Sequence, residues 1–284
     1  MSEAGYDIAI VTDSTCDIPA ALIQRYDLTV VPLYVLWGDE ELQDGVDIDQ
    51  KSFFERLPQD PIHPQTSQPT PGDFVRAMEG LDAQEVLVIT LSKALSGTYE
   101  SAIQARQQLD VPVRVVDSYS MSMGLGWQVL AAAEVREEGG DIEAMIAAAE
   151  RVRERLSLLL TVDTLEYLHR GGRIGGAAKL VGSLVKLKPL LEIDHESGSI
   201  DAVEKIRTRK RSLQQLLDET FRRIDPERPT KAAVMHGAAP DAAEWLRAEV
   251  ESRCAEVEII QRPITPVLGV HGGPGVVGIA AYSE

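Results

Sequence analysis

Short apolar runs alternate with helical patterns along the first half of the chain. Runs at 8–12, 28–36, 86–91 and 113–116 predict buried strands, because they are short, often β-branched and bounded by polar turns. Over 142–156 the apolar residues recur at spacings of three and four, which predicts a helix. Strands that alternate with helices are typical of a mostly parallel α/β sheet.

The second half of the chain has a different pattern. Strands are predicted at 158–162, 190–193, 202–208, 232–235 and 257–260, and helices near 176–186, 212–224 and 240–252. Within 202–208 basic residues alternate with Ile206 and Thr208, and this period of two favours antiparallel pairing. We therefore expect an N-terminal, mostly parallel α/β domain over 1–155 and a mixed α+β domain over 156–284.

Three predicted strands of the first half are followed at once by turns rich in hydroxyl groups. Ser14 follows the first strand, Ser96, Gly97 and Thr98 follow the third, and Ser118 follows the fourth. The carboxyl ends of parallel strands meet at one edge of a sheet, where ligands bind. Because hydroxyls and free backbone amides bind carboxylates or phosphates, the three turns together predict a shared oxyanion site. Any single turn can also be read as a helix cap.

A histidine near the C-terminus is surrounded by glycines. His271 lies in the segment 269–275, which contains four of them. A donor held against an anionic ligand explains this pattern, and so does a tight turn. The histidines at 63, 169 and 195 lie among polar residues and are predicted to be solvated, whereas His236 is predicted to be a satisfied histidine at a strand end.

Basic residues gather in one segment of an acidic chain. The chain has 28 Lys and Arg against 45 Asp and Glu, a net charge of −17, which disfavours binding to nucleic acids or to anionic lipid surfaces. The basic segment is read as a docking patch for an acidic partner or a phosphorylated product, or as a solvated strand face. Its members are Arg170, Arg173, Lys179, Lys186, Lys188, Lys205, Arg207, Arg209, Lys210 and Arg211.

Several kinds of chemistry have no motif in this sequence. There is no Walker A lysine, no G-x-S-x-G and no H-E-x-x-H, and five histidines with two cysteines make a poor zinc set. The one G-x-G-x-x-G, at 273–278, lies too near the C-terminus for a dinucleotide fold. We expect no metal and no cofactor. Two scattered cysteines, no signal-peptide pattern and no apolar stretch of about 18 residues predict a cytoplasmic protein without membrane insertion.

Taken together, the motifs resemble those of the DegV family, which includes the fatty-acid-binding FakB proteins. The matching segments are 12–17, 66–69, 95–102, 171–174, 188–191 and 269–271, in the family's order and over nearly the whole chain. The resemblance implies a two-domain DegV-like fold with a ligand tunnel between the domains. It also implies a bound long-chain fatty acid whose carboxyl group is held by Thr66, Ser96 and His271, with Ser14, Gly97, Thr98 and Ser118 as supporting residues from the turns.

The family resemblance further implies a partner protein. A separate ATP-dependent fatty-acid kinase converts the bound fatty acid to an acyl-phosphate, and Arg173 falls where the family carries a residue that meets this kinase. On this interpretation the chain is a carrier and not itself an enzyme. Two positions depart from the family pattern: Gly272 stands where threonine is usual, and Lys93-Ala94 replaces a small pair.

An enzymatic interpretation also fits the residues. Ser96 and His271 can be a nucleophile and its base in a small-molecule transferase or hydrolase, because a hydroxyl beside an imidazole can clamp a carboxylate or attack a substrate. The ligand that accompanies the purified protein would distinguish the two.

Overall fold

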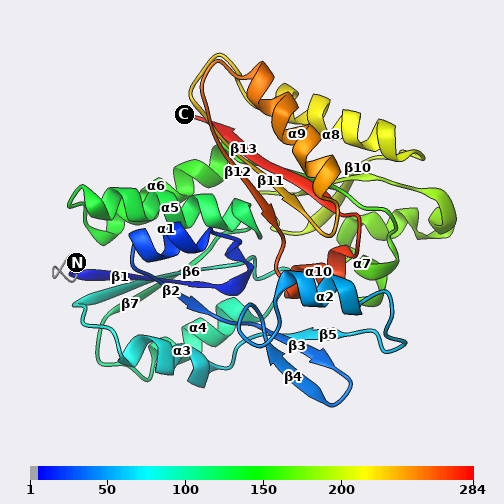
Figure 1. Ribbon diagram of the computed structural model, residues 1–284. Coiled ribbons are helices and arrows are strands. Elements are labelled where there is room, and N and C mark those ends of the chain that lie inside the picture. The colour runs from blue at the N-terminus through cyan, green and yellow to red at the C-terminus, as the bar shows by residue number, and fades with distance from the viewer. Residues whose placement is uncertain (1–5) are drawn as a thin grey trace.

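The computed structural model describes residues 6–284, apart from the side chains of residues 181–186. This part of the chain forms a four-stranded, a six-stranded and a three-stranded β-sheet (Figure 1). Within it, no helix has the length and apolar character that a membrane crossing needs.

The first sheet is parallel, as the sequence predicts. Its strand order is β2-β1-β6-β7, with β1 at Ile8–Asp13, β2 at Leu28–Val31, β6 at Glu85–Thr90 and β7 at Val113–Asp117. Helices α3 (Pro71–Glu79) and α4 (Thr98–Arg106) cover one face, and α1 (Ala20–Arg25) and α5 (Met123–Glu137) cover the other (Figure 1). Thr70 and Asp73 form a capping box at the start of α3, which satisfies amides that a helix leaves free.

The single strand predicted at 28–36 is wrong. The segment forms β2 and then β3 (Tyr34–Trp37), which belong to different sheets. Pro32 lies between them and has no amide hydrogen with which to continue a strand. The third sheet, which the sequence did not predict, joins β3 to β4 (Glu40–Gln43) and β5 (Gln65–Ser67) in antiparallel pairs. The short 3₁₀ helix η1 (Ser14–Cys16) and the helix α2 (Gln50–Arg56) lie in the connections.

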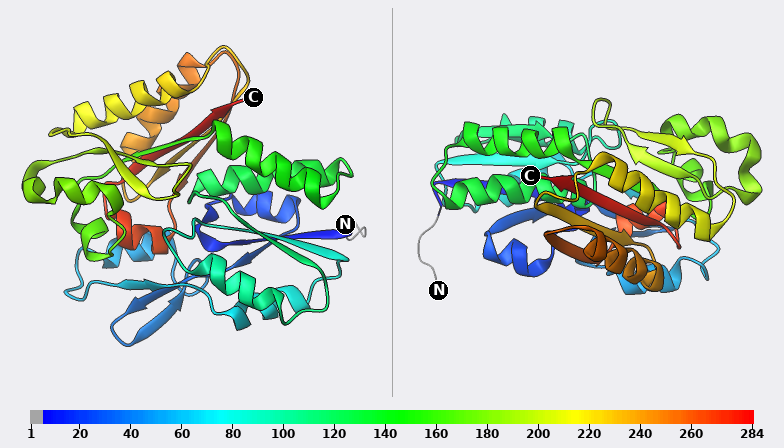
Figure 2. Two further views of the ribbon diagram at one scale, coloured as in Figure 1. Left: turned by 180° about the vertical axis from the view of Figure 1, so that it is seen from behind. Right: turned by 90° about the horizontal axis from the view of Figure 1, so that it is seen from above.

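The second sheet is mixed, as expected, with the order β10-β9-β8-β13-β11-β12 and one parallel pair, β11–β12. Helices α8 (Arg209–Arg223) and α9 (Pro240–Arg253) cover one of its faces (Figure 2). The strands are β8 (Ser157–Thr161), β9 (Leu190–Ile193), β10 (Ile200–Glu204), β11 (Thr230–His236), β12 (Val257–Pro263) and β13 (Val277–Ser283). The remaining helices are α6 (Ile142–Arg155), α7 (Glu166–Arg170), α10 (Pro266–Gly272) and the 3₁₀ helix η2 (Gly175–Lys186).

The strand predicted at 202–208 is wrong in its second half. β10 ends at Glu204 after a register shift, and α8 begins at Arg209. Ile206 is buried in the core beneath α8 and α9, while Lys205 and Arg207 are exposed. The alternation of residues at 205–208 therefore does not reflect a strand: these residues lie in a loop, and Ile206 is the one among them that is buried. The sequence also missed β13, although its neighbouring strands were predicted.

Helices α5 and α6 lie between the first and second sheets and pack on each other (Figure 2). Both contact β13 of the second sheet, and Trp127 of α5 meets Tyr282 of β13 edge to face, with ring centroids 6.3 Å apart. One hydrophobic core therefore runs across both halves of the chain. The predicted boundary near residue 155 falls where α6 gives way to β8, and it stays a prediction.

Candidate ligand-binding site

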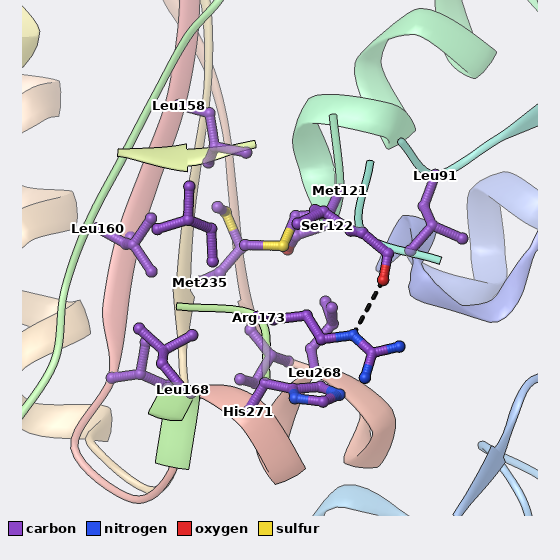
Figure 3. Close-up of a pocket in the computed structure, with 16 residues that line it drawn as sticks. Leu91, Met121, Ser122, Leu158, Leu160, Leu168, Arg173, Met235, Leu268 and His271 are labelled. Carbon is purple, nitrogen blue, oxygen red and sulfur yellow. Dashed lines mark hydrogen bonds between the residues drawn. The ribbon is translucent and has the colours of Figure 1, made fainter. Parts of the chain in front are cut away.

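An apolar pocket lies between the two halves of the chain (Figure 3). It is lined by sixteen residues, which come from both halves of the chain. Leu91 and Met121 line it from the first half, and Leu158, Leu160 and Met235 from the second. Among the sixteen lining residues, the polar side chains are those of Ser122, Arg173 and His271. The pocket therefore suits a mostly apolar ligand with one polar end.

Helix α10 carries His271 to this pocket, and carboxylates of the other half hold the helix in place. Asp17 Oδ1 accepts a hydrogen bond from Thr265 N (2.9 Å), and Asp44 Oδ1 accepts one from Val267 N (3.1 Å). The first amides of a helix have no partner within the helix, so these two contacts fix where α10 begins.

Both carboxyl groups are buried, and burial changes their acidity. Burial raises the pKa of Asp17 to about 7 and that of Asp44 to about 6, although the Ser122 and Ser14 hydroxyls donate to them. Asp13 behaves in the same way, with a pKa raised by burial to about 6. Sequence reasoning missed all three. Asp13 and Asp17 flank a hydroxyl-rich turn and look like ordinary helix caps, and Asp44 lies in a loop with no pattern that marks it.

The His271 imidazole is held on both sides. Its Nε2 lies 2.9 Å from Thr66 Oγ1 of β5, and its Nδ1 has no hydrogen-bond partner among the described residues. A side chain at Gly171 would collide with Nδ1, which explains a glycine there. Burial, aided by the charges of Arg173 and His63, lowers the pKa of His271 to about 4, so the ring is neutral near pH 7.

Arg173 stands where the apolar pocket meets a second, more open recess. Its Nε donates to Leu95 O (3.0 Å), the dashed line of Figure 3, and its Nη1 donates to Gly171 O (2.9 Å). The recess is lined by Lys93, Ser96, Gly97 and Arg173 among others, and it shares Arg173 with the apolar pocket. The sequence predicted a docking residue here, and the structure places its guanidinium within the candidate site.

Contacts between neighbouring segments bring the predicted headgroup residues together. Thr66 touches His271, His271 packs on Gly171, and Arg173 joins Gly171 to the turn that carries Ser96. A side chain at Gly97 would meet the amide of Gln68, two residues beyond Thr66. Thus β5, the turn before α4, the end of α7 and α10 converge on one place.

The other turn residues have internal roles. Ser14 donates to Asp44 and accepts from Leu33 N, and the Ser118 hydroxyl bonds with the backbone of Ser120. Thr98 is buried, with its Oγ1 2.9 Å from Ser96 Oγ. Strands β1, β6 and β7 do lie side by side, as predicted, but Ser14, Thr98 and Ser118 line neither the pocket nor the recess. Thr66 also lines neither, and it reaches the site through its contact with His271.

The predictions that His63 and His195 are solvated are wrong, because both side chains are partly buried. His63 is partly buried with its ring 5.6 Å from that of Tyr167, and burial lowers the pKa of both His63 and His195. His169 is exposed, as expected. His236 is satisfied at the end of β11, as predicted, because its Nδ1 accepts from Ala239 N (3.3 Å).

The two departures from the family pattern both lie at the site. Gly272 lines the apolar pocket, and a Cβ there would come within 3.1 Å of Val276. Lys93 lies at the recess, 3.8 Å from Asp117 and close to Tyr119. In the described part of the chain, no group of three or more His, Cys, Asp or Glu side chains is arranged to hold a metal ion.

In comparisons with known sequences, nearly the whole chain matches one protein family. A family model described as "Uncharacterised protein, DegV family" matches residues 7–284. A DegV domain-containing protein of Streptomyces coelicolor is 38% identical over 284 residues, covering 98% of this chain and 99% of the relative. Protein DegV of Bacillus subtilis is 33% identical over 277 residues, covering 96% and 98%.

Solved structures show the same fold. A DegV family protein of Thermus thermophilus, described as binding fatty acid, superposes with a TM-score of 0.91 at 37% identity, covering 98% of this chain and 100% of that one. Bacillus subtilis DegV, described as a fatty acid binding protein, gives 0.91 at 32% identity and covers 99% and 100%. A stearic acid-binding protein of Eubacterium ventriosum gives 0.86 at 26% identity and covers 98% of both. The expected α/β fold is confirmed.

Proposed function

The chain belongs to the DegV family, and from that premise we propose that it binds one long-chain fatty acid in the apolar pocket. The observation that carries the proposal is a lining that is apolar throughout except for Ser122, Arg173 and His271. Each methylene that leaves water for such a lining contributes roughly 0.8 kcal/mol. Relatives of the same fold described as fatty-acid-binding proteins support the same ligand.

The carboxyl group binds at the polar end of the pocket. His271 lines this end of the pocket, Thr66 supports its imidazole from behind, and Ser96 lines the adjoining recess. The contacts around Gly171 join these segments. His271 is neutral near pH 7, so it does not balance a carboxylate charge. Arg173 is the cation among the lining residues of the apolar pocket, and a buried carboxylate is costly without a charged or hydrogen-bonding partner. We propose that the guanidinium of Arg173 balances the charge of the fatty-acid carboxylate.

The carboxyl group then faces a partner enzyme through the open recess. The recess beside Lys93, Ser96 and Gly97 adjoins the headgroup residues and reaches the surface. An ATP-dependent fatty-acid kinase that docks there would phosphorylate the carboxylate to an acyl-phosphate, with Arg173 within reach of both proteins. The chain is then the carrier subunit, without a cofactor of its own, and it works in the cytoplasm, where ATP is available.

The contacts of Ser96 and His271 favour the carrier over the enzyme. Ser96 Oγ lies 2.9 Å from Thr98, and His271 Nε2 lies 2.9 Å from Thr66. A nucleophile is activated by a hydrogen bond to its base, and here each group has a different neighbour. The transferase or hydrolase interpretation therefore gains no support from the geometry.

Mass spectrometry of an organic extract of the freshly purified protein tests the proposal. We expect one fatty acid per chain. A protein that yields no lipid, and takes up none when incubated with palmitate or oleate, would overturn it. Tightly bound lipid also stabilises the folded state by mass action, so loading is expected to raise the melting temperature.

A further inference from the structure

The glycines of the segment 273–278 do not serve one purpose. Gly273 and Gly275 have φ of +70° and +85°, a backbone conformation that favours glycine. Gly278 lies within β13 without a positive φ, so its backbone places no such demand. A glycine inside a strand lowers stability and often marks a place where a ligand approaches closely. The structure must therefore supply another reason for Gly278.

That reason lies in the sheet register. Gly278 pairs with Leu160 of β8 on one side and with Met235 of β11 on the other. Directly paired residues point to the same face of a sheet, and all three residues line the apolar pocket. Their strand neighbours, such as Leu159 and Val277, point to the other face and pack in the core beneath α8 and α9. A row of three positions thus crosses the wall of the pocket, and its middle position has no side chain.

The row lies part of the way along the pocket. In Figure 3, Leu160 and Met235 lie between His271 at one end and Leu158 at the other. Leu158 is two residues from Leu160 on β8, which corresponds to about 6.6 Å along the strand. A ligand whose carboxyl group binds near His271 must pass this row before it reaches Leu158.

The space at Gly278 is limited. A Cβ there would lie 3.1 Å from Leu159 O, 3.4 Å from Leu160 Cβ and 3.5 Å from Met235 Cε. A methyl group fits with a small adjustment, but the γ-carbons of a larger residue would have to enter the pocket.

We propose that Gly278 determines how long an acyl chain the pocket accepts, because its missing side chain leaves the passage between Leu160 and Met235. This rests on the fatty-acid binding proposed above. Met235 forms the movable side of the passage, since its unbranched thioether side chain adapts to what lies beside it. The size of the residue at position 278 then sets the acyl length beyond which additional methylenes no longer increase the binding affinity.

The test compares saturated fatty acids of 10 to 18 carbons in competition with a fluorescent fatty acid. Gly278→Val is expected to lower palmitate affinity by about tenfold, the equivalent of two methylenes excluded from the pocket. The affinity for decanoate is expected to change less than threefold. Gly278→Ala should fall between the wild type and Gly278→Val. Met235→Ala in the Gly278→Val background should restore palmitate binding, because it reopens the same row.

Each outcome decides one of the two proposals. Variants that keep the wild-type dependence on chain length would overturn the role of Gly278 and leave fatty-acid binding intact. A wild-type protein that binds no fatty acid would overturn the proposed function itself. Circular dichroism and the melting temperature check folding. If Gly278→Val does not fold, Gly278→Ala decides, because a methyl group has room.

Discussion

Asp17 and Thr265 are 248 positions apart in the sequence, yet Asp17 Oδ1 accepts a hydrogen bond from Thr265 N at 2.9 Å. The carboxylate comes from the loop after the first strand, and the amide begins the helix that carries His271. Asp44 makes a second contact of the same kind to Val267 N. The first half of the chain therefore places the imidazole that the second half contributes to the pocket.

The buried Asp17 predicts an unusual dependence of stability on pH. Burial raises its folded-state pKa to about 7, whereas the ordinary value is 3.8. The folded protein then binds this proton more tightly than the unfolded chain does, so through this group stability rises as the pH falls from 7 towards 4. Above pH 7 the group is ionised in both states and its contribution is constant. Each pKa unit corresponds to about 1.4 kcal/mol.

Asp17→Asn isolates this contribution. The difference in unfolding free energy between the wild type and Asp17→Asn is expected to grow in favour of the wild type as the pH falls from 8 to 5, measured by urea denaturation. Other titrating groups, His271 among them, largely cancel in that difference. Asp39→Asn, at an exposed aspartate, is the control. A difference independent of pH for Asp17→Asn would contradict the prediction.

The headgroup residues are tested by removing one polar group at a time. Thr66→Val, Ser96→Ala and His271→Ala are each expected to lower fatty-acid affinity by roughly tenfold to a hundredfold, because a lost hydrogen bond to a charged group is worth about 1.5–3 kcal/mol. The melting temperature of the lipid-free protein should change little for Ser96→Ala. Isothermal titration with palmitate measures the affinity, and unchanged affinity in all three variants would remove these residues from the carboxyl site.

Arg173 is expected to serve both the ligand and the partner. Arg173→Ala should weaken palmitate binding by about tenfold or more, since it removes the cation of the pocket. Arg173→Lys should recover part of the affinity. Arg170→Ala is the matched control, because Arg170 is exposed and paired with Glu166. Full affinity for lipid in Arg173→Ala, with loss only of phosphorylation by a kinase, would restrict Arg173 to docking.

Gly171 is expected to set the position of the imidazole. Its φ is −75°, so alanine meets no backbone strain there, but the added methyl group would collide with His271 Nδ1. Gly171→Ala should therefore displace His271 from Thr66 and weaken lipid binding. At Gly80 a Cβ has open space and the φ is −86°, which makes Gly80→Ala the control. Equal lipid affinity in the two variants would argue against this role.

Local signals predicted some elements well and others not at all. The helix at 142–156 was confirmed because its apolar spacing and the Asp141 cap agree. The strand β13 was missed because Gly278, Ala280 and Ala281 weaken its β-branched signal. Their small size has a reason only in the folded chain, where Gly278 lies at the pocket, Ala280 beside Trp127 of α5, and Ala281 beneath α8 and α9. In 202–208, burial of Ile206 depends on α8 and α9, which no local pattern reveals.

The candidate site shows the same division. The sequence directed attention to the turn of Ser96 and to the glycines around His271, and Ser96, His271 and Gly272 do lie at the pocket or the recess. The turns of Ser14 and Ser118, predicted to share the same anion site, do not line it. The contact between Thr66 and His271 joins positions 205 residues apart, so only the folded chain shows it. Asp17 and Asp44 act through buried contacts with α10, and their residue types alone do not distinguish them from the many other acids of the chain.

Trp127 and Tyr282 join helix α5 to strand β13, so the two halves of the chain share one core. Neither half can lose its packing without exposing the apolar surface of the other. The chain is therefore expected to melt in one cooperative transition, with equal calorimetric and van't Hoff enthalpies. A lipid in the pocket between the halves would then protect every part of the molecule at once, including amides far from the ligand.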